Sequence, residues 1–152
     1  MRFEQVTEHV DEMTIAECLA FLAGSHIGRI AVNVDEFPVV LPVNYQLDEH
    51  SASGPVLVVR TREGSTVSTA AERVAFQIDA IDAACGVGWS VLVRGIMHHV
   101  RGDVLATLSP SVDPHPWLAE RDDWLVINPI AITGRRVLSR EVGFGFHPLG
   151  YL

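Results

Sequence analysis

Apolar and polar residues alternate in several short stretches of the chain, and this period of two is typical of half-buried β-strands. One face of the stretch 39–47 carries Val39, Leu41, Val43, Tyr45 and Leu47. The same pattern predicts strands over 27–34, 56–61, 74–79 and 89–100, and two closing strands over 124–128 and 130–137 on either side of Pro129. Pro42 cannot donate to a strand ladder, so we expect its side of the strand to lie at an edge or beside a ligand.

Helical signals are few and short. Thr14 and Glu17 have the spacing of a capping box, and the apolar positions after them repeat at helical spacing as far as Gly24. We therefore expect a helix over 14–23, a second over about 65–71 after Gly64, and a helical turn over 103–108. Segments rich in Ser, Gly or Pro predict loops over 48–55 and 109–117.

Short, evenly spaced strands with one or two small helices predict a mainly β fold, a six-stranded antiparallel barrel that is closed or nearly closed. A length of 152 residues suits one full core and is too short for two ordinary domains. We expect a single domain over 1–152, with an N-terminal extension over 1–12 and an aromatic, glycine-rich C-terminal tail over 138–152. The tail either folds back over the barrel or reaches a partner subunit.

Composition restricts the possible partners. The net charge is −8, and its eleven basic residues are all Arg, which argues against a nucleic-acid surface. No apolar run approaches the roughly 18 to 20 residues that span a bilayer, and the start of the chain lacks a secretory pattern, so we expect a cytoplasmic protein without membrane contact. Cys18 and Cys85 form neither a disulfide pattern nor a metal-binding pair, and both are expected to be small buried residues.

The segment Arg60-Thr61-Arg62-Glu63-Gly64-Ser65-Thr66 is the best candidate for a binding site. A strand that ends in Arg-Thr and passes through Gly-Ser into a helix start brings a guanidinium, hydroxyls and backbone N–H groups together, and a phosphate fits such a place. The alternative is that Ser65 only caps its helix and that the arginines are solvated.

Other polar and aromatic groups predict less. His98 and His99 are adjacent on a strand, so their side chains point to opposite faces and do not share a metal ion, and we expect no metal site. The acidic pair Asp122-Asp123 is expected to be solvated in a turn. Trp117 and Trp124 are expected to be packing residues.

Several motifs follow one another in a characteristic order: Pro42-Val43-Asn44-Tyr45, Arg60-Thr61 with Gly64-Ser65, Arg73-Val74-Ala75-Phe76, the run from Gly88 to Gly95, and Ile132-Thr133-Gly134-Arg135-Arg136. In this order the chain resembles the pyridoxamine 5′-phosphate oxidase-like superfamily of flavin-binding split β-barrel proteins, from Thr14 to about Arg136. The resemblance is closest to the small actinobacterial-type members.

The resemblance implies a homodimer with FMN at the subunit interface. Backbone groups of Val40, Pro42, Val43, Asn44 and Tyr45 would line the isoalloxazine ring. The ribityl phosphate would be held by Arg60, Thr61, Ser65 and Thr66, while Trp89 and Ser90 would approach from a neighbouring strand or subunit. Such proteins commonly continue Gly-Ser with a cation, whereas this chain has Thr66 and Val67. A lost charge-assisted hydrogen bond would weaken affinity about tenfold to a hundredfold unless Arg60 or Arg62 compensates.

The sequence therefore predicts an FMN-dependent oxidoreductase that acts on a small molecule, with no catalytic side chain singled out because the flavin carries the electrons. One alternative is a reductase that uses the deazaflavin F420, although the acidic balance and the absence of Lys weigh against its polyanionic tail. Another is a non-catalytic flavin-binding, haem-binding or structural dimer, which the altered Gly-Ser-Thr-Val segment favours.

Overall fold

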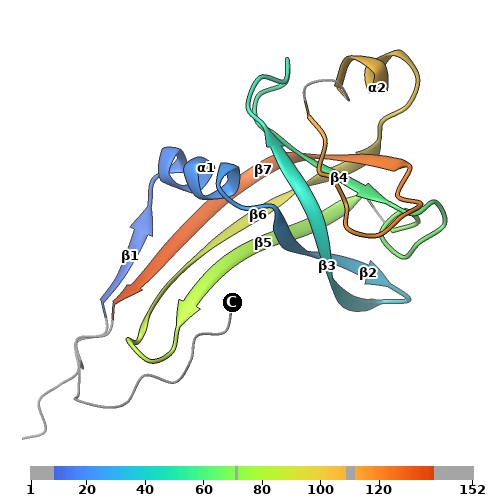
Figure 1. Cartoon of the computed structure of the whole chain (residues 1–152). Helices are drawn as coiled ribbons and strands as arrows, with labels where there is room; N and C mark the ends of the chain where they lie inside the picture. Colours follow the sequence, from blue (N-terminus) through green and yellow to red (C-terminus); the bar gives the residue numbers. More distant parts are fainter. Residues whose placement is uncertain (1–8, 71, 109–111, 139–152) are drawn as a thin grey trace, which may run out of the picture.

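The computed structural model describes residues 9–70, 72–108 and 112–138. The strands in this part of the chain are β1 (His9–Met13), β2 (Ile27–Val34), β3 (Phe37–Asp48), β4 (Val56–Thr61), β5 (Arg73–Asp82), β6 (Val87–His99) and β7 (Asp123–Leu138). The helices are α1 (Ile15–Ala23) and α2 (Asp103–Leu108) (Figure 1).

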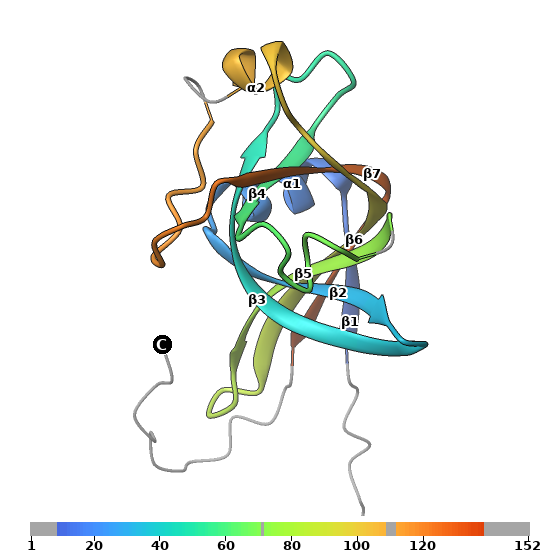
Figure 2. The same cartoon turned by 90° about the vertical axis from the view of Figure 1, so that its right-hand side faces the viewer.

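Six strands close a ring in the order β7-β4-β3-β2-β5-β6, and β6 pairs back onto β7. All of these pairings are antiparallel. Strand β1 lies outside the ring and pairs with the second half of β7. Figure 2 looks through the opening of this ring. The predicted mainly β fold with a six-stranded split barrel is confirmed, and β1 is an additional strand that the sequence did not predict.

Strand β7 corrects the prediction of two closing strands, because it runs without a break through Pro129. Arg94 pairs with Ala131 and Gly95 with Pro129, so Ile130 is an extra residue that bulges from the ladder. A proline is tolerated at such a bulge since the ladder hydrogen bond is already interrupted there.

Helix α1 covers one opening of the barrel and inserts Cys18 and Leu22 into the core (Figure 2). The capping box is present: Thr14 accepts from the Glu17 N–H, and the Glu17 carboxylate accepts from the Thr14 N–H at 2.8 Å. The predicted helix is therefore confirmed, with Thr14 as its N-cap. Tyr45 ties the helix to β3, because its hydroxyl donates to the Leu22 carbonyl at 2.7 Å.

Strand β4 is buried on both faces. Leu57 and Val59 belong to the barrel core, whereas Val56 and Val58 pack outside the barrel. That second cluster also includes Trp124 and Val126, with Leu105 and Leu108 of α2 packed against it. The two-sided cover explains why the sequence of β4 is a continuous apolar run instead of an alternating one.

The ends of the chain lie mostly outside the described residues. Residues 9–12 of the predicted extension belong to β1, and of the predicted tail over 138–152 only Leu138 is described. Neither helix in the described part of the chain has the length and apolar character that a membrane crossing requires.

Candidate functional site

A cleft of about 290 Å³ opens between β3, the end of β4, the turn 62–70 and the segment 112–122. Seven of the residues predicted from the sequence line it, namely Pro42, Val43, Asn44, Arg60, Thr61, Ser65 and Thr66. The other lining residues are Leu41, Arg62, Val67, Pro116, Leu118 and Arg121, and of these only Arg62 belongs to the segment that the sequence predicts as a binding site.

One wall of the cleft is a free strand edge. Strand β3 pairs with β2 over Phe37–Asn44, but it pairs with β4 only from Tyr45 to Asp48. On the side of β4, the stretch from Phe37 to Asn44 therefore has no strand partner among the described residues. Pro42 lies on this edge, as expected from its missing N–H. Backbone groups along the edge can bind a flat ligand in the way that they would bind another strand.

The turn 62–70 forms the hydroxyl-rich wall. The predicted helix over about 65–71 is wrong: this stretch makes successive turns, with Thr69 N–H donating to Ser65 O and Ala70 N–H to Val67 O at 3.0 and 3.3 Å. Hydroxyl and β-branched side chains compete with helical hydrogen bonding, which explains the difference. The hydroxyl oxygens of Thr61 and Ser65 lie 2.8 Å apart, and Ser65 Oγ also accepts from the Ser68 N–H.

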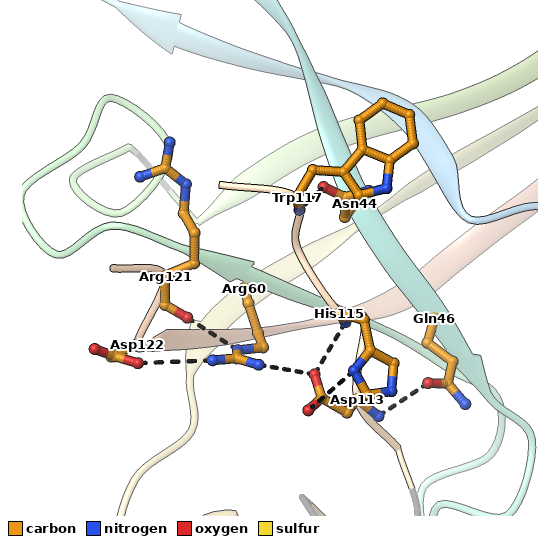
Figure 3. Close-up of polar contacts among 8 residues, drawn as sticks. All are labelled: Asn44, Gln46, Arg60, Asp113, His115, Trp117, Arg121 and Asp122. Carbon is orange, nitrogen blue, oxygen red and sulfur yellow. Dashed lines mark hydrogen bonds and ion pairs between the residues drawn. The ribbon is translucent and has the colours of Figure 1, made fainter. Parts of the chain in front are cut away.

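Arg60 is not solvated and is not free. Its Nε donates to the Arg121 carbonyl at 2.9 Å, and its Nη1 donates to Asp113 Oδ1 at 2.9 Å (Figure 3). Its Nη2 lies 3.6 Å from Asp122 Oδ1, and the guanidinium carbon lies 4.8 Å from the centre of the Trp124 ring. The side chain is only 19% exposed.

The pKa of the Asp113 carboxyl group depends on its burial and on two neighbours, His115 and Arg60. Desolvation is the largest single influence and raises its pKa, but the His115 N–H and the hydrogen bond and charge of Arg60 together outweigh it. The net result is a pKa below the ordinary value, so this group is ionised at neutral pH and forms a true ion pair with Arg60.

Arg62 and Arg121 are the other two cations of the cleft. Among the described residues neither guanidinium makes an ion pair, in contrast to Arg60. The Arg121 side chain turns away from Arg60 and Asp122 (Figure 3). Both are therefore available to an anion in the cleft.

Four predicted site residues lie elsewhere in this chain. The Tyr45 side chain is fully buried in the core, with its ring edge-on to Phe76, so only its backbone can meet a ligand. Trp89 packs against Phe21 and lines a separate groove of about 260 Å³ together with Ser90. Val40 is 58% exposed on the outside of the barrel, in another groove that also includes Ser90. Contact of Trp89 and Ser90 with the cleft of a partner subunit stays a prediction.

Asp123 corrects the expectation of a solvated acidic pair, because only Asp122 is exposed. The Asp123 side chain is 5% exposed, and its Oδ1 lies 2.9 Å from His99 Nδ1. His99 Nε2 donates to the Ser68 carbonyl, which anchors the turn 62–70. Within the described chain, Asp123 Oδ2 is buried without a hydrogen-bond partner.

The remaining sequence expectations divide as follows. His98 faces Asn128 and His99 faces Asp123, which confirms that the two histidines point apart. Trp124 is buried as expected, whereas Trp117 is 80% exposed, so its expected packing role is wrong within this chain. No group of three metal-binding side chains occurs among the described residues.

Comparison with known proteins identifies the fold. The family model for pyridoxamine 5′-phosphate oxidase matches residues 14–136. The chain belongs to this family. The match covers both walls of the cleft and the ring of strands except the last two residues of β7, so the family assignment includes the elements that build the candidate site.

Three similar proteins share sequence or fold with the chain. The FAD-binding protein of Mycobacterium smegmatis is 30% identical, with a TM-score of 0.63 over 84% of this chain and 98% of that one. A Corynebacterium diphtheriae protein of unknown function is 24% identical, with a TM-score of 0.70 over 83% of this chain and 96% of that one. An uncharacterized Mycobacterium tuberculosis protein is 28% identical over 89% of this chain and 90% of its own length.

Proposed function

We propose that the protein binds a flavin nucleotide, FMN, in the cleft and acts as a flavin-dependent oxidoreductase on a small molecule. One observation carries the proposal: the same cleft contains the free edge of β3, several hydroxyl groups and two arginines without ion pairs among the described residues. Family membership and the FAD-binding M. smegmatis relative support it.

The residues of the cleft suit the two halves of a flavin nucleotide. Thr61 and Ser65 offer hydroxyl donors, and Arg62 and Arg121 offer positive charge for a phosphate. Backbone groups of Pro42 to Asn44 and the apolar Leu118 suit a flat, largely apolar ring. The bound flavin would supply the redox chemistry, and the chain would supply position and exclude water.

We further propose that the functional unit is a homodimer. The outward residues of β2, β3, β5, β6 and β7 form two adjoining grooves of about 440 and 420 Å³. Val40, Leu92 and Ile130 are 58%, 39% and 68% exposed there. Arg29, Arg73, Arg94 and Arg135 line the same grooves, and exposed apolar side chains among them, if left uncovered, favour association. In such a dimer the resemblance expects Trp89 and Ser90 of the second copy to approach the cleft.

The proposed function is tested by the visible spectrum of the purified protein and by titration with FMN. Absorption near ~450 nm is the flavin band, and absorption near ~420 nm would instead identify F420. We expect one FMN per chain. A colourless protein that takes up neither cofactor would refute the flavin assignment and leave the fold intact.

The dimer has a separate test. Val40→Glu places a charge on the outer face without touching the core, and we expect light scattering to report a monomer for this variant and a dimer for the wild type. His50→Glu, on the loop between β3 and β4, is the matched control and should remain dimeric. A wild-type monomer at micromolar concentration would contradict the proposal.

A further inference from the structure

The three arginines of the cleft have different surroundings, and this difference separates their roles. We infer that Arg60 is a positioning residue that fixes the segment 112–122 as a wall of the cleft, while Arg62 and Arg121 bind the anionic group of the ligand. The second half of this inference rests on the proposed function, because it needs an anion in the cleft.

Most of the Arg60 guanidinium is already engaged within the chain. Each of its three nitrogens already faces an oxygen, from Arg121, Asp113 or Asp122, and one face of the guanidinium covers the Trp124 ring (Figure 3). A phosphate at this position would displace an existing carboxylate and would meet the charge of the other one. The net charge of this group of three side chains is already negative, which repels an anion.

The side chain of Arg60 also extends from the other face of its strand. Along β4, Leu57, Val59 and Thr61 share the face toward the core, and Arg60 shares the opposite face with Val58. The Thr61 hydroxyl meets Ser65 on the first face, whereas the Arg60 guanidinium meets Trp124 on the second. The two residues therefore do not converge on one phosphate through their side chains.

Arg60 connects both ends of the segment. Asp113 stands near its start, and Arg121 and Asp122 stand at its end, so one guanidinium bridges the two. Between them the segment is attached to β3, where Asn44 Oδ1 accepts from the Trp117 N–H at 3.3 Å. Two residues within it, His115 and Glu120, have φ angles of 46° and 59°. Such angles are unfavourable for residues other than glycine and persist only where the surroundings hold them.

Arg121 becomes a ligand-binding cation through this arrangement. Its carbonyl is fixed by Arg60, while its side chain turns away from the ion pairs and lines the cleft with Arg62. The segment thus provides the positive charge that the turn after Ser65 lacks. A guanidinium can bind two phosphate oxygens at once, so two of them replace a missing cation well.

The first experiment measures how firmly the segment 112–122 is held in the protein without any ligand. Trypsin cleaves after Arg121, and mass spectrometry reports the rate at this bond in the folded full-length protein. We expect Arg60→Gln and Asp113→Asn to increase this rate at least about tenfold, because each removes a bond that holds the segment. Asp35→Asn, at the tip of the β2–β3 hairpin, changes the same charge as Asp113→Asn and should leave the rate unchanged. Equal rates in all four proteins would overturn the positioning role.

The second experiment separates the phosphate from the ring by comparing FMN with riboflavin, which lacks the phosphate. We expect Arg62→Gln and Arg121→Gln to reduce the ratio of the two affinities about tenfold or more, with riboflavin binding unchanged. Arg60→Gln should weaken both ligands alike and keep the ratio. A ratio that collapses only in Arg60→Gln would overturn the inference.

The cleavage rate and the flavin affinities distinguish failure of the proposed function from failure of the inference about Arg60. If the wild type binds no flavin, the proposed function fails, and cleavage after Arg121 still decides whether Arg60 fixes the segment. If Arg60→Gln does not fold, Asp113→Asn provides the same comparison, since it leaves the guanidinium and all cleft-lining residues in place.

Discussion

The hydroxyl of Tyr45 bonds the Leu22 carbonyl and also meets the Ser25 side chain, and its removal tests how α1 is held in the barrel. The side chain is fully buried, and its hydroxyl donates to Leu22 O at 2.7 Å. Leu22 lies in the last turn of α1, where carbonyl groups lack a helical N–H partner. Burial raises the pKa of Tyr45, so the phenol remains a donor through the neutral and mildly alkaline range.

Tyr45→Phe keeps the ring and its edge-on contact with Phe76, at 4.7 Å between centroids, and removes only the donor. A buried carbonyl left without a partner costs about 1 to 3 kcal/mol. A loss of about 1.5 kcal/mol lowers the Tm of a domain of this size by about 3 to 6 °C. We expect this decrease in thermal unfolding followed by far-UV circular dichroism at one fixed protein concentration.

The control is Phe37→Leu, at the start of the same strand, where the side chain is 72% exposed and a small change is expected. The urea m-value should be the same in all three proteins, because the surface exposed on unfolding hardly changes. A Tm of Tyr45→Phe within about 1 °C of the wild type would refute the reasoning, since the Leu22 carbonyl would then have another donor.

Three further predictions concern the barrel and the site. Gly95→Ala should cost about 3 kcal/mol in urea unfolding, because the added Cβ would collide with the backbone carbonyl of Asn128, while Gly24→Ala meets only ordinary contacts and should be nearly neutral. His99→Ala leaves the Ser68 carbonyl without a donor and removes the nearest partner of Asp123, which keeps only Arg101 at 3.8 Å, and should cost about 2 kcal/mol; an unchanged urea midpoint would contradict this. Arg60→Gln should raise the pKa of Asp113 toward its ordinary value in an NMR titration of the carboxyl group. Because that pKa is depressed in the folded protein, the ion pair stabilises the fold above about pH 4 and is lost as the pH falls through the lowered value.

Much of the barrel could be predicted because its signals are local. Alternation identifies β2 and β3, and the capping box at Thr14 identifies α1. Strand β1 carries no such signal, since the run His9–Met13 becomes a strand only by pairing with Val137 and its neighbours on β7. The helix predicted over about 65–71 is absent from the described residues of this stretch, because a glycine followed by serine begins turns as well as helices.

The candidate site could be predicted only where it is contiguous in sequence. Thr61, Ser65 and Thr66 follow one another from the end of β4, so the motif alone locates the hydroxyl wall. Arg121 comes from a segment without periodic pattern, 61 positions away from its partner Arg60. The sequence also does not show which of Arg60 and Thr61 faces the core, because β4 is apolar on both faces and its alternation cannot be read.

In this chain the positive charge for an anion comes partly from Arg121 on the segment 112–122 and not from a cation directly after Gly64-Ser65. The wall of the cleft and the anion site therefore depend on the same segment. Where a cation follows Gly-Ser directly, the turn alone fixes it, but Arg121 reaches the cleft only while the segment 112–122 is in place. Ordering a free arginine side chain costs up to about 2 kcal/mol, which would cancel most of a charge-assisted bond of about 1.5 to 3 kcal/mol. Arg60 fixes the backbone of Arg121 before the ligand arrives, so that only the side-chain part of the ordering cost remains at binding. Substitutions at Asp113, which does not line the cleft, should therefore weaken flavin binding in this chain, whereas a cation fixed in the turn itself would be insensitive to them.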